Sequence, residues 1–129
     1  DGTLWCWGYG LVGLLPASCG TGSFCTGFHS GTPIQVQPGS SWRGVSASGL
    51  STCAIRDDGT LWCFGDYTMA SGRHVPTQIG TATNWGALSC GSQTVCGLRD
   101  DALWCFGNNG AGEFGDGTSW QETPLRIGP

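Results

Sequence analysis

Residues 58–65 decide the fold class, and they read Asp58-Gly59-Thr60-Leu61-Trp62-Cys63-Phe64-Gly65. The same pattern stands at residues 1–8 and, shortened by one residue, at residues 101–107. A second block, in which a Trp leads to a Cys-x-Ile/Leu-Arg sequence, fills residues 42–56 and recurs at residues 85–99. Because these blocks return in the same order along the chain, the sequence predicts a repeat architecture.

A third, weaker element starts with Pro and ends with Val or Ile, at residues 33–36, 76–79 and 124–127. Each repeat unit therefore contains four short apolar segments joined by Gly-rich turns. No long stretch follows the 3.6-residue period of a helix. Four short strands per repeat are typical of a β-propeller blade, so we expect an all-β chain built from such blades.

The hairpin around residues 57–59 places two cysteines opposite each other. If these residues form a three-residue loop, Gly59 takes the left-handed position that such a turn requires. Cys53 then faces Cys63 on the neighbouring strand. Facing residues of paired strands lie about 4.5–5.5 Å apart, within reach of a disulfide, so we predict a Cys53–Cys63 bond.

The next hairpin has lost one loop residue and keeps the same cysteine register. With a two-residue loop at 100–101, Cys96 faces Cys105, and we predict a second cross-strand disulfide there. The opposite face of this hairpin sets Trp104 against Gly97, so the strand pair is apolar on both faces. Such a pair must be covered on both faces, which stacked blades achieve.

Residues 106–118 read Phe106-Gly107-Asn108-Asn109-Gly110-Ala111-Gly112-Glu113-Phe114-Gly115-Asp116-Gly117-Thr118. Together with the hairpins and the Pro-x-x-Val segments, this stretch resembles the repeat of the regulator of chromosome condensation family. Residues 7–15 follow the pattern in part, whereas the middle copy departs from it after Gly65. The resemblance implies a β-propeller, usually seven-bladed, that is used for protein recognition. It does not imply one function, since relatives include a nuclear nucleotide-exchange factor, secreted bacterial inhibitors and receptor ectodomains.

The repeats divide the chain into two complete blades and two flanking strands. We expect blades at residues 33–65 and 76–107, the last strand of a preceding blade at residues 1–8, and the first strand of a following blade at residues 124–129. Seven blades of this repeat length need far more than 129 residues. The chain is therefore expected to be part of a larger propeller of about seven blades. The alternative is an open assembly in which edge strands pair with those of a neighbouring copy.

The chain has eight cysteines, and four of them lie outside the two hairpins. Cys6 stands on a Leu-Trp-Cys strand, so its partner is expected in a preceding strand. A local bridge between Cys19 and Cys25 is the first expectation for those two. Cys90 is extra to the repeat and could instead reach one of them, so this pairing stays open. Paired cysteines are typical of oxidising compartments, and we expect an extracellular or cell-surface protein.

Charge and hydropathy narrow the classes of partner. The chain carries 9 acidic and 5 basic residues, for a net charge of −4. Nucleic-acid surfaces cluster Lys and Arg, so no nucleic-acid partner is expected. No apolar stretch approaches the ~18 residues of a membrane-spanning helix, so no membrane span is expected. Arg56 and Arg99 each precede an acidic doublet and are expected to form local ion pairs of small energy.

No catalytic residue, metal or cofactor is expected. His29 and His74 are isolated, no Cys-x-x-Cys pair is present, and no nucleophile motif surrounds a Ser. Residues 8–13 match a Gly-x-Gly-x-x-Gly fingerprint, but no helix follows them, as dinucleotide binding requires. Residues 108–116 hold Asn, Glu and Asp among glycines, which we interpret as turn chemistry rather than a calcium loop.

The joints between blades vary in length and are the expected recognition loops. Their candidate contact residues are Phe24, Phe28, His29, Tyr67, Met69, Arg73 and His74. The competing interpretation is that Phe24 and Phe28 simply pack around a local disulfide. We predict a non-enzymatic, extracellular protein-recognition module, with a structural subunit of an extracellular fibre or surface assembly as the alternative. Guanine-nucleotide exchange, suggested only by the family resemblance, ranks third.

Overall fold

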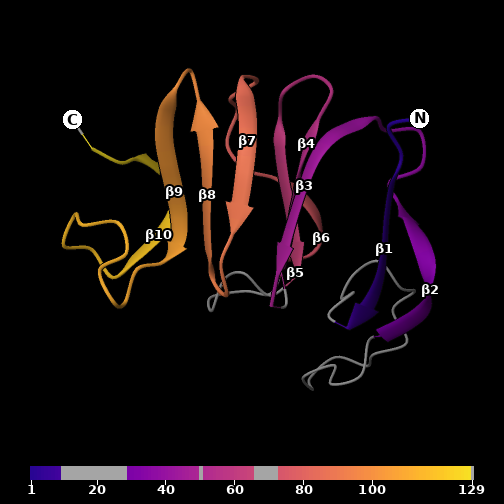
Figure 1. Cartoon of the computed structure of the whole chain (residues 1–129), viewed down its shortest axis with the longest axis horizontal. Helices are drawn as coiled ribbons and strands as arrows, with labels where there is room; N and C mark the ends of the chain where they lie inside the picture. Colours follow the sequence, from indigo (N-terminus) through magenta and orange to yellow (C-terminus); the bar gives the residue numbers. More distant parts are fainter. Residues whose placement is uncertain (10–28, 50, 66–72, 129) are drawn as a thin grey trace.

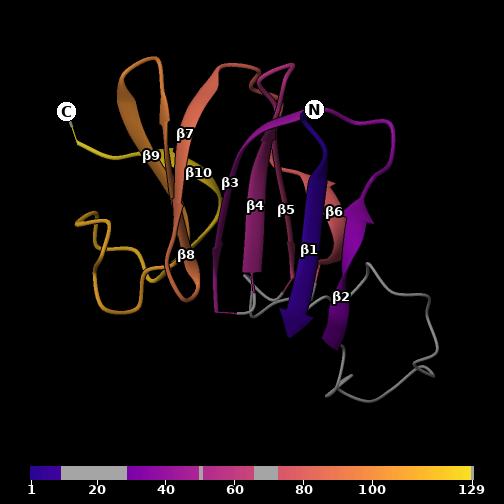
Figure 2. The same cartoon turned by 45° about the vertical axis from the view of Figure 1, so that its right-hand side comes forward.

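The computed structural model describes residues 1–9, 29–49, 51–65 and 73–128, and it places ten β-strands and no helix in them. The strands are β1 (Leu4–Tyr9), β2 (His29–Val36), β3 (Trp42–Ser48), β4 (Ser51–Arg56), β5 (Leu61–Gly65), β6 (Arg73–Gln78), β7 (Trp85–Cys90), β8 (Thr94–Arg99), β9 (Ala102–Asn108) and β10 (Trp120–Arg126). They form three antiparallel sheets that stand side by side like part of a fan (Figures 1 and 2). The all-β prediction is therefore confirmed.

Two sheets have four strands each, in the orders β3-β4-β5-β6 and β7-β8-β9-β10, and the third sheet pairs β1 with β2. In each sheet the Pro-containing strand lies outermost, on the Leu-Trp-Cys strand that precedes it. The complete blades thus span residues 42–78 and 85–126. The predicted spans, 33–65 and 76–107, begin one strand too early.

The same shift corrects the predicted flanking strands. The strand within residues 1–8 shares its sheet with β2, and the segment that begins at residue 124 belongs to the last complete blade. A periodic sequence does not indicate at which strand the four-stranded unit starts. Proline does give a signal, because it has no backbone N–H and therefore favours the edge strand of a sheet.

The central hairpins have the predicted register. Cys53 faces Cys63 and Cys96 faces Cys105, and both pairs are disulfide-bonded, which confirms the two predicted bonds. Gly59 has a φ of +83° and closes the first loop, as its predicted left-handed position requires. These two hairpins form the centre of the two blades, and the second one supplies Arg99 to the cleft described below.

Both faces of the β4-β5 hairpin are buried. Cys53, Ile55 and Leu61 lie in an apolar cluster with Trp85 and Phe106 of the next blade. The opposite face packs into a second cluster, in which Ala54 and Phe64 meet Leu4, Val36 and Trp42. Full burial of such a side chain contributes roughly 1.5–3 kcal/mol, so the contacts between blades are a main source of stability. In the described residues, no helix is long and apolar enough to cross a membrane.

Candidate binding cleft between the blades

The Asp-Gly-Thr turn of the hairpin is held by a chain of hydrogen bonds. The Thr60 backbone N–H and hydroxyl both donate to Asp58 Oδ1, at 2.9 and 2.6 Å, and Trp62 Nε1 donates to Thr60 Oγ1 at 2.9 Å. These bonds from Thr60 lower the pKa of the Asp58 carboxyl below its ordinary value. Asp1, Thr3 and Trp5 repeat the arrangement in the first sheet. The recurring Asp-Gly-Thr-Leu-Trp sequence therefore orients a tryptophan ring beside each turn.

An arginine stacks on that ring in both complete blades. The Arg56 guanidinium carbon lies 3.8 Å from the ring centre of Trp62 and 5.2 Å from that of Trp42. Arg99 lies 3.7 Å from the ring centre of Trp104, in the equivalent position. The predicted ion pairs with the acidic doublets stay predictions, and attraction to Arg56 is one of the smaller causes of the lowered pKa of the Asp58 carboxyl. In the β3-β4 register Trp42 faces Arg56, so the guanidinium meets tryptophan faces, to which cations are attracted.

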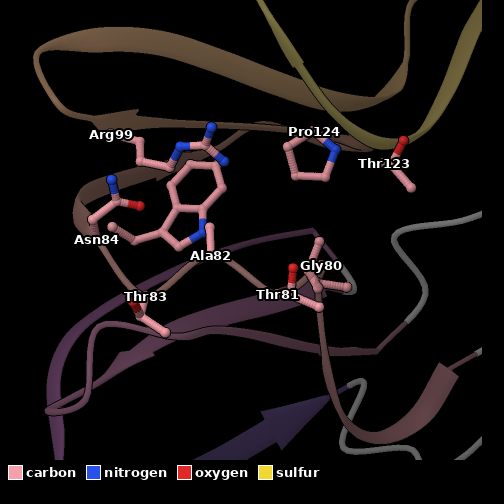
Figure 3. A pocket seen from close by; sticks show the side chains of 10 residues that line it. Gly80, Thr81, Ala82, Thr83, Asn84, Arg99, Thr123 and Pro124 are labelled. Carbon is pink, nitrogen blue, oxygen red and sulfur yellow. The ribbon is translucent and has the colours of Figure 1, made fainter.

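A cleft of about 510 Å³ opens beside Arg99, between the second and third blades. It is lined by Ile79, Gly80, Thr81, Ala82, Thr83, Asn84, Trp85, Arg99, Thr123 and Pro124. Figure 3 shows Arg99 and Pro124 on one wall and the segment from Gly80 to Thr83 on the other. The volume is within the ~300–1,000 Å³ range of ligand sites, and the lining mixes polar and apolar groups.

The loop that forms one wall is anchored to the preceding blade. The Trp85 N–H donates to the Gly59 carbonyl at 3.2 Å, and the Ile79 N–H donates to the Leu61 carbonyl at 2.8 Å. The Thr83 carbonyl oxygen would lie only 1.8 Å from a Cβ atom at residue 59. Only glycine therefore fits at residue 59, where it serves both the turn and the close approach of this loop.

The predicted recognition residues lie elsewhere in the chain. Phe24, Phe28, Tyr67 and Met69 are outside the described residues, as are Cys19 and Cys25. His29 faces Tyr9 at the start of β2, and Arg73 faces Gly65 at the start of β6, next to His74. These strand ends lie away from the hairpin turns that flank the cleft. Sequence reasoning missed the cleft, although one signal was present: Gly80 stands where the preceding repeat has Gln37.

The two free cysteines of the described segments are half-buried thiols. Cys6 faces Ile34 across β1 and β2, and burial raises the pKa of its thiol. The Cys90 thiol donates to the Ser46 carbonyl at 3.3 Å, and burial also raises its pKa. Cys90 is thus a free thiol in this structure, and the predicted pairing of Cys19 with Cys25 lies outside the described residues.

The Asn-rich loop after β9 is organised around Asn109, which is almost fully buried. Its side-chain nitrogen donates to Asp116 Oδ1 at 2.8 Å and to the Thr118 carbonyl at 2.7 Å, while its oxygen accepts from the Phe114 N–H at 2.8 Å. Hydrogen bonds from Thr118 lower the pKa of the Asp116 carboxyl. The loop therefore follows the predicted turn chemistry. Among the residues with a described position, no group of three or more metal-ligating side chains occurs.

Among known proteins, only solved structures resemble this chain. No protein-family model matches the chain, and no curated protein matches it. Human WBSCR16 superposes with a TM-score of 0.73 at 19% identity, over 99% of this chain and 34% of that one. Prp20p from Saccharomyces cerevisiae superposes with a TM-score of 0.75 at 18% identity, over 98% of this chain and 34% of that one. Its structure comes from a study of its binding to Gsp1p and histones.

The fold is that of an RCC1-type β-propeller. Yeast RCC1 (Prp20) bound to Kap60 agrees, with a TM-score of 0.73, 18% identity and coverage of 98% of this chain. This chain spans about a third of each of these RCC1-family propellers. It therefore forms part of a propeller, as its two complete blades and one two-stranded sheet also indicate.

Proposed function

We propose that this chain is a non-enzymatic recognition module that binds protein partners through the surface between its blades. The observation that carries the proposal is the cleft beside Arg99, which lies between two blades whose central hairpins are each stapled by a disulfide. A rigid scaffold with an irregular surface between its elements is where binding function is usually found. The RCC1-type fold supports this proposal, because Prp20p is described as binding Gsp1p and histones.

We further propose an extracellular or cell-surface location. Both disulfides join strands inside a blade, and bonds of this kind persist in oxidising compartments, whereas reducing compartments keep thiols reduced. The proposed location also makes guanine-nucleotide exchange a weaker candidate function than protein recognition, because exchange on a small GTPase takes place inside the cell. An exchange assay with a small GTPase is therefore expected to show no acceleration of nucleotide release. A clear acceleration would favour the exchange function instead.

Site-specific crosslinking tests the recognition surface directly. A photo-crosslinking residue at Thr81, on the wall of the cleft, should capture a distinct extracellular protein. The same residue at Ala111, which is exposed on the loop after β9, serves as the matched control. Capture of the same proteins from both positions, or from neither, would contradict binding through the cleft.

A second candidate function is self-assembly into an extracellular structure, in which the outer faces of the fan pack on other copies of this chain rather than on further blades of one longer propeller. Trp7 of β1 is 63% exposed, whereas the equivalent Phe64 and Phe106 are buried. At the other end, Leu98 and Leu103 are exposed, although their equivalents in the middle blade are buried. The two outer faces thus resemble the two halves of the interface between blades. Analytical sedimentation should show that the chain associates with itself and that Leu103→Glu abolishes this association. Val75→Glu, a substitution at an exposed position of β6, is the control and should leave the association intact. A monomer under all conditions would exclude this candidate.

A further inference from the structure

The two complete blades differ at one position next to the stacked arginine. In the middle blade the Arg56 guanidinium donates from Nη2 to Gln37 Oε1, so a carboxamide oxygen caps it. The equivalent of Gln37 in the next repeat is Gly80, which has no side chain. Within the described residues the Arg99 guanidinium, the counterpart of Arg56, stacks on tryptophan but has no hydrogen-bond acceptor.

The backbone at both positions has the same unusual conformation. Gln37 has a φ of +45° and Gly80 a φ of +65°, so both residues lie in the left-handed region. A Cβ atom on Gly80 would meet no other atom within 4 Å. The cleft of about 510 Å³ therefore includes the space that a side chain at residue 80 would occupy. Gln37 demonstrates that a glutamine can adopt this backbone conformation and reach the arginine.

The cleft offers one further polar side chain beside Arg99. Trp85 lines the cleft, but its Nε1 is buried without a partner in the described part of the chain, as is that of the equivalent Trp42, so it provides no donor to the cleft. Asn84 donates from its side-chain nitrogen to Asp100 Oδ2, and Figure 3 shows the Asn84 oxygen on the side of the cleft. The cleft therefore presents a donor at Arg99 and an acceptor at Asn84. A group bound between them needs both an acceptor and a donor.

We propose that this cleft binds the glutamine side chain of a protein partner, whose carboxamide takes the place at Arg99 that Gln37 takes at Arg56. The proposal rests on the proposed function and adds the chemistry of the bound group. The amide oxygen accepts from Arg99, and the amide nitrogen donates to Asn84 Oδ1. A carboxylate would set a negative oxygen against Asn84 Oδ1 and near the Asp100 carboxylate, so the neutral amide is favoured.

Substitutions at residue 80 test whether the cleft is built for this group. In Gly80→Gln, the new glutamine side chain should fill the cleft, and the melting temperature should be higher than that of Gly80→Met. The methionine variant is the matched control, because it has a similar length and the same backbone requirement but no amide. Gln37→Gly should open a second cleft beside Arg56. Equal melting temperatures for the glutamine and methionine variants would contradict a specific amide site.

Small probes test the ligand directly, without any protein partner. N-acetylglutamine methylamide should shift the Trp85 indole resonance in NMR spectra of the unmodified protein, with a dissociation constant on the order of millimolar. Gly80→Gln should lose that shift, and N-acetylleucine methylamide should give none. No shift with the glutamine probe, or an equal shift in Gly80→Gln, would overturn the site. Tighter binding of N-acetylglutamate methylamide would overturn the choice of the amide. These outcomes do not depend on whether a partner protein is captured, so failure here is separable from failure of the proposed function.

Discussion

The two complete blades share one sequence pattern and one strand order, yet they differ in how their hairpins are covered and capped. In the middle blade Ile55 is 1% exposed, because the next blade packs on it, whereas its counterpart Leu98 is 46% exposed on the outer face. The middle blade has an Asp-Gly-Thr turn, and its Arg56 donates a hydrogen bond to Gln37. The last blade has a shortened turn, and Gly80 stands in place of that glutamine beside Arg99. The repeat pattern thus determines the strand register inside each blade, whereas the two copies differ in their turns and in the joints between blades.

The largest expected difference between the blades concerns burial. Leu61→Ala should lower the free energy of unfolding by about 3 kcal/mol, since it leaves a cavity in the apolar cluster between the blades. Leu103→Ala, at the equivalent exposed position, should cost about 0.5 kcal/mol. Urea denaturation of both variants measures this difference. Equal costs would mean that the outer face is covered in solution and that the comparison is wrong.

Disulfide removal should give a smaller contrast. The two bonds close loops of similar size, with sequence separations of 10 and 9, so the chain-entropy contribution of each is about 2–3 kcal/mol. Replacing Cys53 and Cys63 together by Ala should cost more, because both residues are fully buried between blades. Replacing Cys96 and Cys105 together serves as the control. Thermal unfolding in which the control pair is the more damaging would contradict this ranking.

The hydrogen-bond chain at the turn predicts a more modest effect. Thr60→Val should cost about 1–2 kcal/mol, because it removes the acceptor of Trp62 Nε1 and a donor to Asp58. In the last blade this chain is already broken, since the shortened turn has no Thr and Trp104 Nε1 is buried without a partner among the described residues. Trp104→Phe should therefore cost less than Trp62→Phe in chemical denaturation. The reverse order would show that the indole hydrogen bond does not stabilise the turn.

The smallest effect is a pH dependence from Asp58. Hydrogen bonds from Thr60 hold its folded-state pKa below the ordinary value of 3.8, so its contribution to stability is present above about pH 4 and is lost as the pH falls below that value. Asp58→Asn should flatten the acid limb of a plot of melting temperature against pH. Asp57→Asn, at the neighbouring exposed position, is the control. An unchanged acid limb in Asp58→Asn would contradict the assigned cause of the pKa shift.

Sequence reasoning could predict the hairpins because turn length and cysteine position together determine the register. It missed the blade boundaries because a periodic pattern has no marked starting strand, although the edge preference of Pro76 and Pro124 pointed to the answer. The stacking of Arg56 and Arg99 on tryptophan was not predicted, because it depends on tryptophans that are brought together only across strands. The cleft was missed because its walls, the segment from Ile79 to Trp85 and the residues Arg99 and Pro124, come together only in the folded chain. The recognition residues Phe24, Phe28, Tyr67 and Met69 stay predictions.

Peptide mapping of the natural protein, digested without reduction and with free thiols blocked, tests the central claim most directly. The blade architecture in an oxidising compartment predicts one linked peptide pair containing Cys53 and Cys63 and another containing Cys96 and Cys105, with Cys90 recovered as a blocked free thiol. Cross-pairing between the two hairpins would contradict the register of the blades. Recovery of all four hairpin cysteines as free thiols would contradict the disulfides and the extracellular location inferred from them.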